Sequence, residues 1–258
     1  MKQLFTLALI FLGSVKLFAQ GGYDDLRVMY VEEDYEKCYK KCLKYLEDDE
    51  AKRDALPYFY FAATNYRLSE KAKYAEDYPN AEKDAISYAG KFVKKDKNGD
   101  YADYDLKVRF FEELKMDLAE QVENYWEEGS EKAYKKAVGV LKKAEKVDPN
   151  DSGITLLRGI VEIYTGNKTE GKQVVADGYE RVKMTGVDVT FADLSASTQY
   201  FYKMALMRYA KFRVESKDPS GALEVLTLGH SYFYDENEDY HHEYNTDFKK
   251  FYDELNQQ

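Results

Sequence analysis

Residues 134–149 read Tyr134-Lys-Lys-Ala137-Val-Gly-Val-Leu141-Lys-Lys-Ala144-Glu-Lys-Val-Asp-Pro149, and this stretch decides the fold. Ala137, Leu141 and Ala144 recur at intervals of four and three residues, which places them on one face of a helix. Small residues on such a face let a neighbouring helix approach closely, and the final Pro cannot continue the helix. The same spacing occurs four more times, at Cys38-Cys42-Tyr45, Ala85-Ala89-Phe92, Gly171-Val175-Gly178 and Ala222-Leu226-Gly229.

Helical periodicity extends over most of the chain, and the alternation typical of strands is almost absent. Four of these stretches have an upstream pair that ends in a small residue, which a helix packed against its own hairpin partner requires: Phe61-Ala62, Leu118-Ala119, Arg158-Gly159 and Met204-Ala205. With turn and cap residues between the periodic stretches, the pattern predicts helices at 23–32, 34–49, 54–76, 79–95, 103–128, 130–147, 152–165, 167–184, 197–215, 218–233 and 245–257.

At these residues the chain resembles the tetratricopeptide repeat (TPR) family. The stretch from Tyr134 to Pro149 is similar to that family's second helix with its terminal Pro. The small-residue and turn positions of a complete 34-residue unit are matched by Gly159, Gly166-Asn167, Gly171, Val175 and Gly178. Successive copies start 47, 52, 34 and 51 residues apart, Arg158 stands where a Leu is usual, and Trp126 is not at the family's Trp position.

The resemblance implies an all-α fold over residues 20–258, namely a TPR-like α-solenoid of about five stacked helical hairpins with a C-terminal capping helix. An irregular helical bundle is the alternative. Binding of a protein or peptide in the concave groove, as part of a cell-envelope assembly, is the function that the resemblance implies.

The charge balance narrows the class of partner. The 258 residues carry 38 Lys and Arg against 48 Asp and Glu, a formal net charge of −10. Such a surface repels phosphate, which disfavours nucleic acid and anionic membranes as partners. The 2 Cys are too few for a disulfide scaffold.

Residues 1–19 have the pattern of a secretory signal peptide. Lys2 is a short basic region, the apolar run from Leu4 to Val15 is too short to span a bilayer, and Ala19 is a small residue at the expected cleavage point. No Cys follows that would anchor a lipoprotein, and no later stretch is apolar enough to cross a membrane. We therefore expect a periplasmic protein that begins at Gln20; an uncleaved N-terminal anchor or a buried first helix is the alternative.

Cys38 and Cys42 lie four residues apart within a predicted helix. A disulfide between these positions strains the geometry of the bond, and a metal site would need further ligands that the neighbouring sequence does not supply. We expect two small, buried core residues.

No motif for catalysis, phosphate binding or dinucleotide binding occurs, so we expect neither enzymatic activity nor a cofactor. His230, His241 and His242 lie among carboxylates, and His together with carboxylates can bind zinc. A solvated acidic loop explains these residues better, because the adjacent His241 and His242 would point to different faces of any helix. The segments 96–100 and 235–239 lack the glycine and glutamate positions of a calcium loop. Asn98-Gly99 instead favours a turn with a positive φ.

The resemblance also indicates where a partner would bind. If the first helix of each hairpin lines the concave side, residues around Ala62, Gly159 and Ala205 form an apolar and aromatic stripe without carboxylates. The predicted groove residues are Phe59, Ala63, Tyr66, Arg67, Leu156, Ile160, Ile163, Tyr164, Tyr202, Leu206, Tyr209 and Ala210. This stripe suits an amphipathic helix or an extended apolar peptide. The alternatives are a stripe buried under inserted segments, a glycan or small ligand stacked on exposed Tyr rings, and an enzyme that uses His241 and His242.

Overall fold

The computed structural model describes residues 21–101, 104–188, 191–235, 239–240 and 245–257. The predicted signal peptide lies outside these residues, as do His241 and His242. Within them the expected all-α fold is confirmed, except for one antiparallel pair of short strands, β1 (Tyr234–Asp235) and β2 (Asp239–Tyr240). The chain divides into two compact units, and the boundary follows Asp100.

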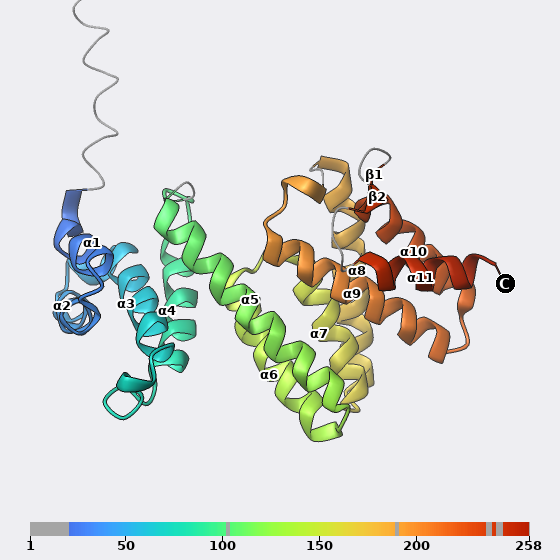
Figure 1. The fold of residues 1–258 in the computed structure, drawn as a ribbon, viewed down its shortest axis with the longest axis horizontal. Coiled ribbons are helices and arrows are strands. Elements are labelled where there is room, and N and C mark those ends of the chain that lie inside the picture. Colours follow the sequence, from blue (N-terminus) through green and yellow to red (C-terminus); the bar gives the residue numbers. More distant parts are fainter. Residues whose placement is uncertain (1–20, 102–103, 189–190, 236–238, 241–244, 258) are drawn as a thin grey trace, which may run out of the picture. The chain divides into compact units, whose positions relative to one another are not determined.

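In the part of the first unit that the structure describes, four α-helices are joined by turns and loops (Figure 1). They are α1 (Asp24–Val31), α2 (Tyr35–Glu47), α3 (Leu56–Ser69) and α4 (Ala81–Lys95), with 3-10 turns at Gly21–Tyr23, Ala51–Arg53 and Ala72–Tyr74. α3 lies against both α2 and α4, and only Tyr58, Arg67 and Ser69 of its residues are not buried. α3 is therefore the core helix of this unit.

The described residues of the second unit form three hairpins and a terminal helix (Figure 1). Its elements are α5 (Asp105–Glu128), α6 (Glu131–Val147), α7 (Ser152–Tyr164), α8 (Lys168–Asp188), a 3-10 turn (Phe191–Asp193), α9 (Ala196–Glu215), α10 (Pro219–Phe233) and α11 (Asn245–Asn256). Each helix packs against its hairpin partner, and α7 also packs against α6 and α9. The first hairpin reaches the third, because α5 contacts α9. A linear stack, in which each hairpin touches only its neighbours, would not give this contact.

Local signals explain where the helices begin and end. The side chains of Ser130, Asp151 and Ser195 accept hydrogen bonds from the first turns of α6, α7 and α9, which stabilises those N-termini. The predicted bounds agree with the structure to within about four residues, except for the helix predicted at 54–76. This helix ends at Ser69, because Lys71 is extended (φ −106°, ψ 111°).

Glycines set the distance between α7 and α8. A Cβ atom added at Gly159 would lie 2.6 Å from the backbone N of Val175, and one added at Gly178 would lie 2.5 Å from the backbone N of Leu156. Both distances are far below ordinary contact, so the two backbones meet where the small-residue pattern predicted close approach.

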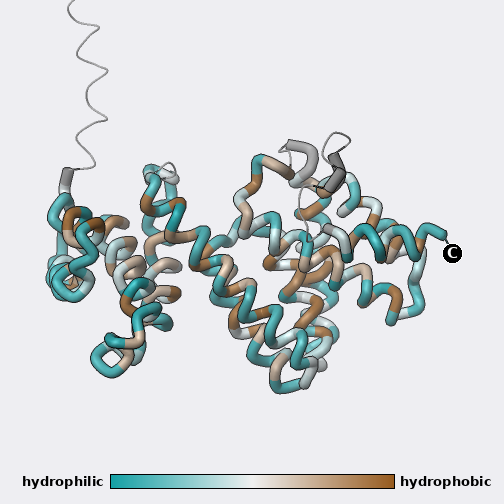
Figure 2. Tube along the Cα trace, in the orientation of Figure 1, coloured by the Kyte–Doolittle hydropathy of each residue, from teal (hydrophilic) through white to brown (hydrophobic). Residues whose placement is uncertain are grey.

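Burial follows the amphipathic pattern. Figure 2 shows hydrophobic and hydrophilic residues alternating along α5 and α6, as expected for helices with one buried face. Cys38 and Cys42 are free and fully buried, which confirms their predicted place in the core, and burial raises the pKa of the Cys42 thiol. Among the helices described, none combines the length and the apolar character needed to span a bilayer.

Candidate binding surface

The predicted groove residues divide into a buried majority and three that reach the surface. Arg67, Ile163 and Tyr164 are partly exposed. The others have exposed fractions of 6% or less: Phe59, Ala63, Tyr66, Leu156, Ile160, Tyr202, Leu206, Tyr209 and Ala210. The expectation of an open stripe is therefore wrong for these nine residues, and the alternative of a buried core describes them.

Neighbouring helices account for this burial. α7 packs against α6, α8 and α9, which covers Leu156 and Ile160 from several sides. Tyr202 of α9 donates or accepts hydrogen bonds with Ser152 and Thr185, and Tyr209 packs edge-to-face on Tyr179 at 5.1 Å. Fully buried positions of this kind contribute to folding and offer no surface to a partner.

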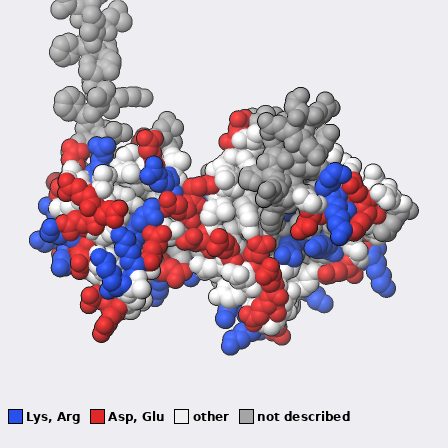
Figure 3. Space-filling model, viewed as in Figure 1, with Lys and Arg blue, Asp and Glu red and all other residues white. Residues whose placement is uncertain are grey.

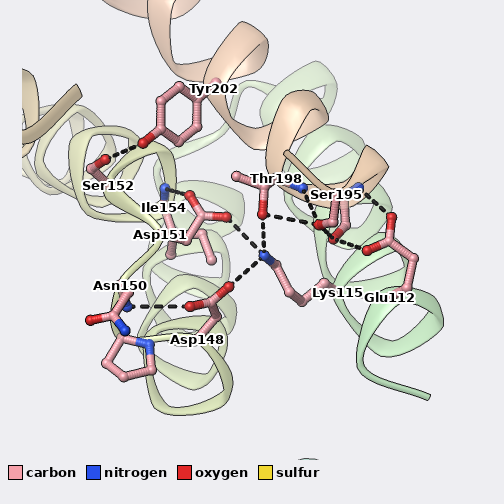
Figure 4. A network of polar contacts seen from close by, with 12 residues as sticks. Glu112, Lys115, Asp148, Asn150, Asp151, Ser152, Ile154, Ser195, Thr198 and Tyr202 are labelled. Carbon is pink, nitrogen blue, oxygen red and sulfur yellow. Dashed lines mark hydrogen bonds and ion pairs between the residues drawn. The ribbon is translucent and has the colours of Figure 1, made fainter. Parts of the chain in front are cut away.

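The second unit also contains a buried polar network (Figure 4). The ammonium of Lys115, only 4% exposed, donates to Asp148 at 2.7 Å, Asp151 at 2.9 Å and Thr198 at 2.8 Å. Burial lowers the pKa of Lys115, but the two carboxylates outweigh that effect and the pKa is raised, so Lys115 stays charged. Nearby, Glu112 accepts hydrogen bonds from the backbone N and the hydroxyl of Ser197.

The network joins α5, the α6–α7 turn and α9. An ammonium has three N–H donors, and all three are used here, so Lys115 has none left for a substrate. Asp151 also accepts from the backbone N of Ile154 at 3.2 Å and thereby caps α7. We interpret the network as structural.

Lys203 of α9 is the second buried lysine in the described residues, with an exposed fraction of 4%. Burial lowers its pKa to about 6, and the charges of Glu123 and Asp247 only partly oppose this. A neutral amine can act as a base or nucleophile, but substrate must reach it. Burial denies that access to Lys203.

A different set of side chains converges at the surface of the second unit. Four partly exposed rings, each from a different helix, come together: Trp126 of α5, Tyr134 of α6, Tyr164 of α7 and Phe212 of α9. We call these four residues with Arg208 the aromatic cluster.

The rings of the aromatic cluster pack on one another. Tyr134 and Tyr164 stack with centroids 5.2 Å apart, and Trp126 meets both edge-on at 5.6 Å. Phe212 contacts Tyr164 edge-on at 6.1 Å. The guanidinium of Arg208 lies 4.9 Å from the centre of the Trp126 ring. These mutual contacts hold the rings in place without a ligand.

The polar edge of the aromatic cluster is defined by Tyr164, whose hydroxyl donates to Glu215 at 2.5 Å. Burial, and then this carboxylate, raise the pKa of Tyr164, so its hydroxyl stays protonated. Arg208 forms no ion pair within 4.0 Å among the residues that the structure describes. The cluster thus offers ring edges and an available guanidinium.

Little in the sequence pattern indicated the aromatic cluster. Tyr164 was a predicted groove residue, whereas Trp126, Tyr134, Arg208 and Phe212 were not. They lie at the end of α5, the start of α6 and the last turns of α9, and Trp126 and Phe212 are 86 residues apart along the chain. Their proximity depends on how the helices pack.

The remaining sequence candidates give no site in the described residues. His230 stacks on Tyr252 with centroids 4.8 Å apart, and no group of three His, Cys, Asp or Glu residues in the described chain could hold a metal ion. Gly99 has a φ of 68°, as predicted for a turn at Asn98-Gly99. Most of the segment 235–243 lies outside the described residues.

Comparison with known proteins supplies no family for this chain. No protein-family model, no curated protein and no solved structure matches it significantly.

Proposed function

We propose that the protein is an exported, non-catalytic interaction module of TPR-like helical hairpins, which binds a protein partner through the aromatic cluster. The observation that carries this proposal is the convergence of four partly exposed rings and one arginine from four helices. Residues of these types dominate the energetics of protein interfaces, where Trp, Tyr and Arg are the commonest hot spots.

Preorganisation supports binding at this surface. The rings already constrain one another through stacked and edge-to-face contacts. Ordering a rotamer-rich side chain at an interface costs about 0.5–1.5 kcal/mol, and most of that cost is avoided when the side chain is held beforehand. A partner that covers Trp126 therefore gains buried apolar area at little entropic cost.

The orientation of the rings favours a protein over a glycan. A sugar that stacks on an aromatic side chain needs an open ring face. Tyr134 and Tyr164 stack on each other, and Arg208 occupies one face of Trp126. A protein partner can instead place an apolar side chain against the ring edges and a carboxylate or carbonyl oxygen at the guanidinium of Arg208.

Site-specific photo-crosslinking tests this function. A benzophenone amino acid replaces Tyr134, and in the matched control it replaces Tyr252, a partly exposed tyrosine of α11. After irradiation of native cells, the Tyr134 position should give a discrete adduct with one envelope protein, and the Tyr252 position should not. Identical adducts from both positions, or no adduct from Tyr134, would contradict the proposal.

A further inference from the structure

The first unit carries a second aromatic surface, in which five rings follow one another in space. Successive ring centroids are 6.1 Å apart for Tyr58 and Tyr88, 4.4 Å for Tyr88 and Phe61, 5.1 Å for Phe61 and Tyr39, and 5.0 Å for Tyr39 and Tyr78. The rings come from α2, α3, α4 and the turn before α4. We call them the tyrosine row.

The tyrosine row is accessible and has free hydrogen-bond donors. Phe61 is buried at 2% exposure, and the four tyrosines around it are partly exposed. The hydroxyls of Tyr58 and Tyr78 donate to the carbonyl of Lys52 and to Glu36. Those of Tyr39 and Tyr88 have no acceptor among the described residues.

Two lysines add further donors. The ammonium of Lys91 lies 3.7 Å from the ring centre of Tyr88, and that of Lys95 lies 4.9 Å from the ring centre of Tyr58. Both lysines are exposed, and neither forms an ion pair with a carboxylate of the described chain. Figure 3 shows Lys and Arg side chains among the acidic ones around α3 and α4 on the visible face of this unit.

Nearby carboxylates limit the charge of a ligand. Glu36 accepts a hydrogen bond from Tyr78. Burial, and then the charge of nearby Asp84, raise the pKa of Tyr39. A polyanion would be repelled by both. The surface therefore favours a ligand that is rich in hydrogen-bond acceptors, apolar and uncharged.

We infer that the tyrosine row binds a proline-rich peptide in the extended polyproline II conformation. Proline supplies a carbonyl acceptor and no N–H donor, which matches a surface whose unused groups are the hydroxyls of Tyr39 and Tyr88 and the ammonium groups of Lys91 and Lys95. The carbonyls of this helix have no internal partners, and its preformed geometry lets pyrrolidine rings dock between aromatic side chains at a low entropic cost.

Fluorescence polarisation with a labelled decaproline peptide tests the inference on the mature chain, residues 20–258. Decaproline should bind saturably. In NMR spectra of the protein, the amide chemical shifts that change on binding should belong to α2, α3 and α4. Replacement of both hydroxyls, Tyr39→Phe with Tyr88→Phe, keeps the rings and should weaken binding by roughly tenfold, because two hydrogen bonds are lost. The control Tyr252→Phe, at a partly exposed tyrosine of the second unit, should leave the affinity unchanged.

Three results would overturn the inference. They are the absence of decaproline binding up to millimolar concentration, unchanged affinity in the double variant, and tighter binding of a deca-glutamate peptide or a neutral hexasaccharide. Thermal melts followed by circular dichroism establish that the double variant is folded. Because the readout is decaproline affinity, failure here leaves the function proposed for the aromatic cluster standing.

Discussion

A single methyl group at Gly159 tests how closely α7 and α8 are packed. In Gly159→Ala the new Cβ would lie 2.6 Å from the backbone N of Val175, and because comfortable contacts begin near 3.4 Å, the helices must separate by about 0.8 Å. Overpacking of this kind costs about 1–3 kcal/mol, whereas replacing a helical Gly by Ala gains about 1 kcal/mol. The free energy of unfolding should therefore fall by about 0–2 kcal/mol.

Gly139→Ala is the matched control. Gly139 is exposed within α6, and an added Cβ would meet nothing within 4 Å, so this variant should gain about 1 kcal/mol from helix propensity alone. The difference between the two variants, about 1–3 kcal/mol, isolates the packing cost. Urea unfolding followed by the emission of Trp126, the chain's 1 Trp, reports on the second unit. Equal stabilisation by both substitutions would refute the close approach of α7 and α8.

Three further outcomes can be checked by standard measurements. Lys115→Met should lower the free energy of unfolding by about 3–5 kcal/mol in urea titrations, because it leaves Asp151 buried and uncompensated, whereas Lys135→Met at the surface should change it by less than about 1 kcal/mol. Lys203 binds a proton up to its ordinary pKa of 10.5 in the unfolded chain, but only below about 6 in the folded chain. The free energy of unfolding should therefore rise with pH between these two values, and Lys203→Met should remove that rise. Mass spectrometry of the protein from its native envelope should show a chain that begins at Gln20, and an intact residue 1 would contradict export with cleavage.

The helices could be predicted from the sequence because their signals are local. Ala137, Leu141 and Ala144 are fully buried on one face of α6, as their spacing indicates. The small residues at Gly159 and Gly178 also predicted the close crossing of α7 and α8 correctly. The contact of α5 with α9 was not predictable, since it depends on how whole hairpins pack.

The candidate binding surface was harder to predict, because the exposure of a side chain depends on tertiary packing. The stripe was placed by analogy on helices whose apolar residues occupy more than one face, and such helices are usually covered on several sides. Leu156, Leu157, Ile160 and Val161 carried this signal within α7. Lys115 lies on the same helix face as Ala119, four residues later, which could have indicated a buried, paired lysine. No comparable pattern links Trp126 to residues on three other helices.

The fluorescence emission of Trp126 tests directly whether the aromatic cluster binds a protein partner. Titration with the partner that photo-crosslinking identifies should change the emission of this tryptophan saturably, because the partner covers its ring. Arg208→Ala removes a cation–π contact with Trp126 that is worth about 0.5–1 kcal/mol, so the fold should stay intact. The Kd should rise by at least about tenfold, because the variant also removes the guanidinium from the interface. Arg181→Ala, at a partly exposed arginine of α8, is the control and should bind like the wild type. Partner binding that leaves the emission of Trp126 unchanged, or an unaltered Kd in Arg208→Ala, would contradict the account.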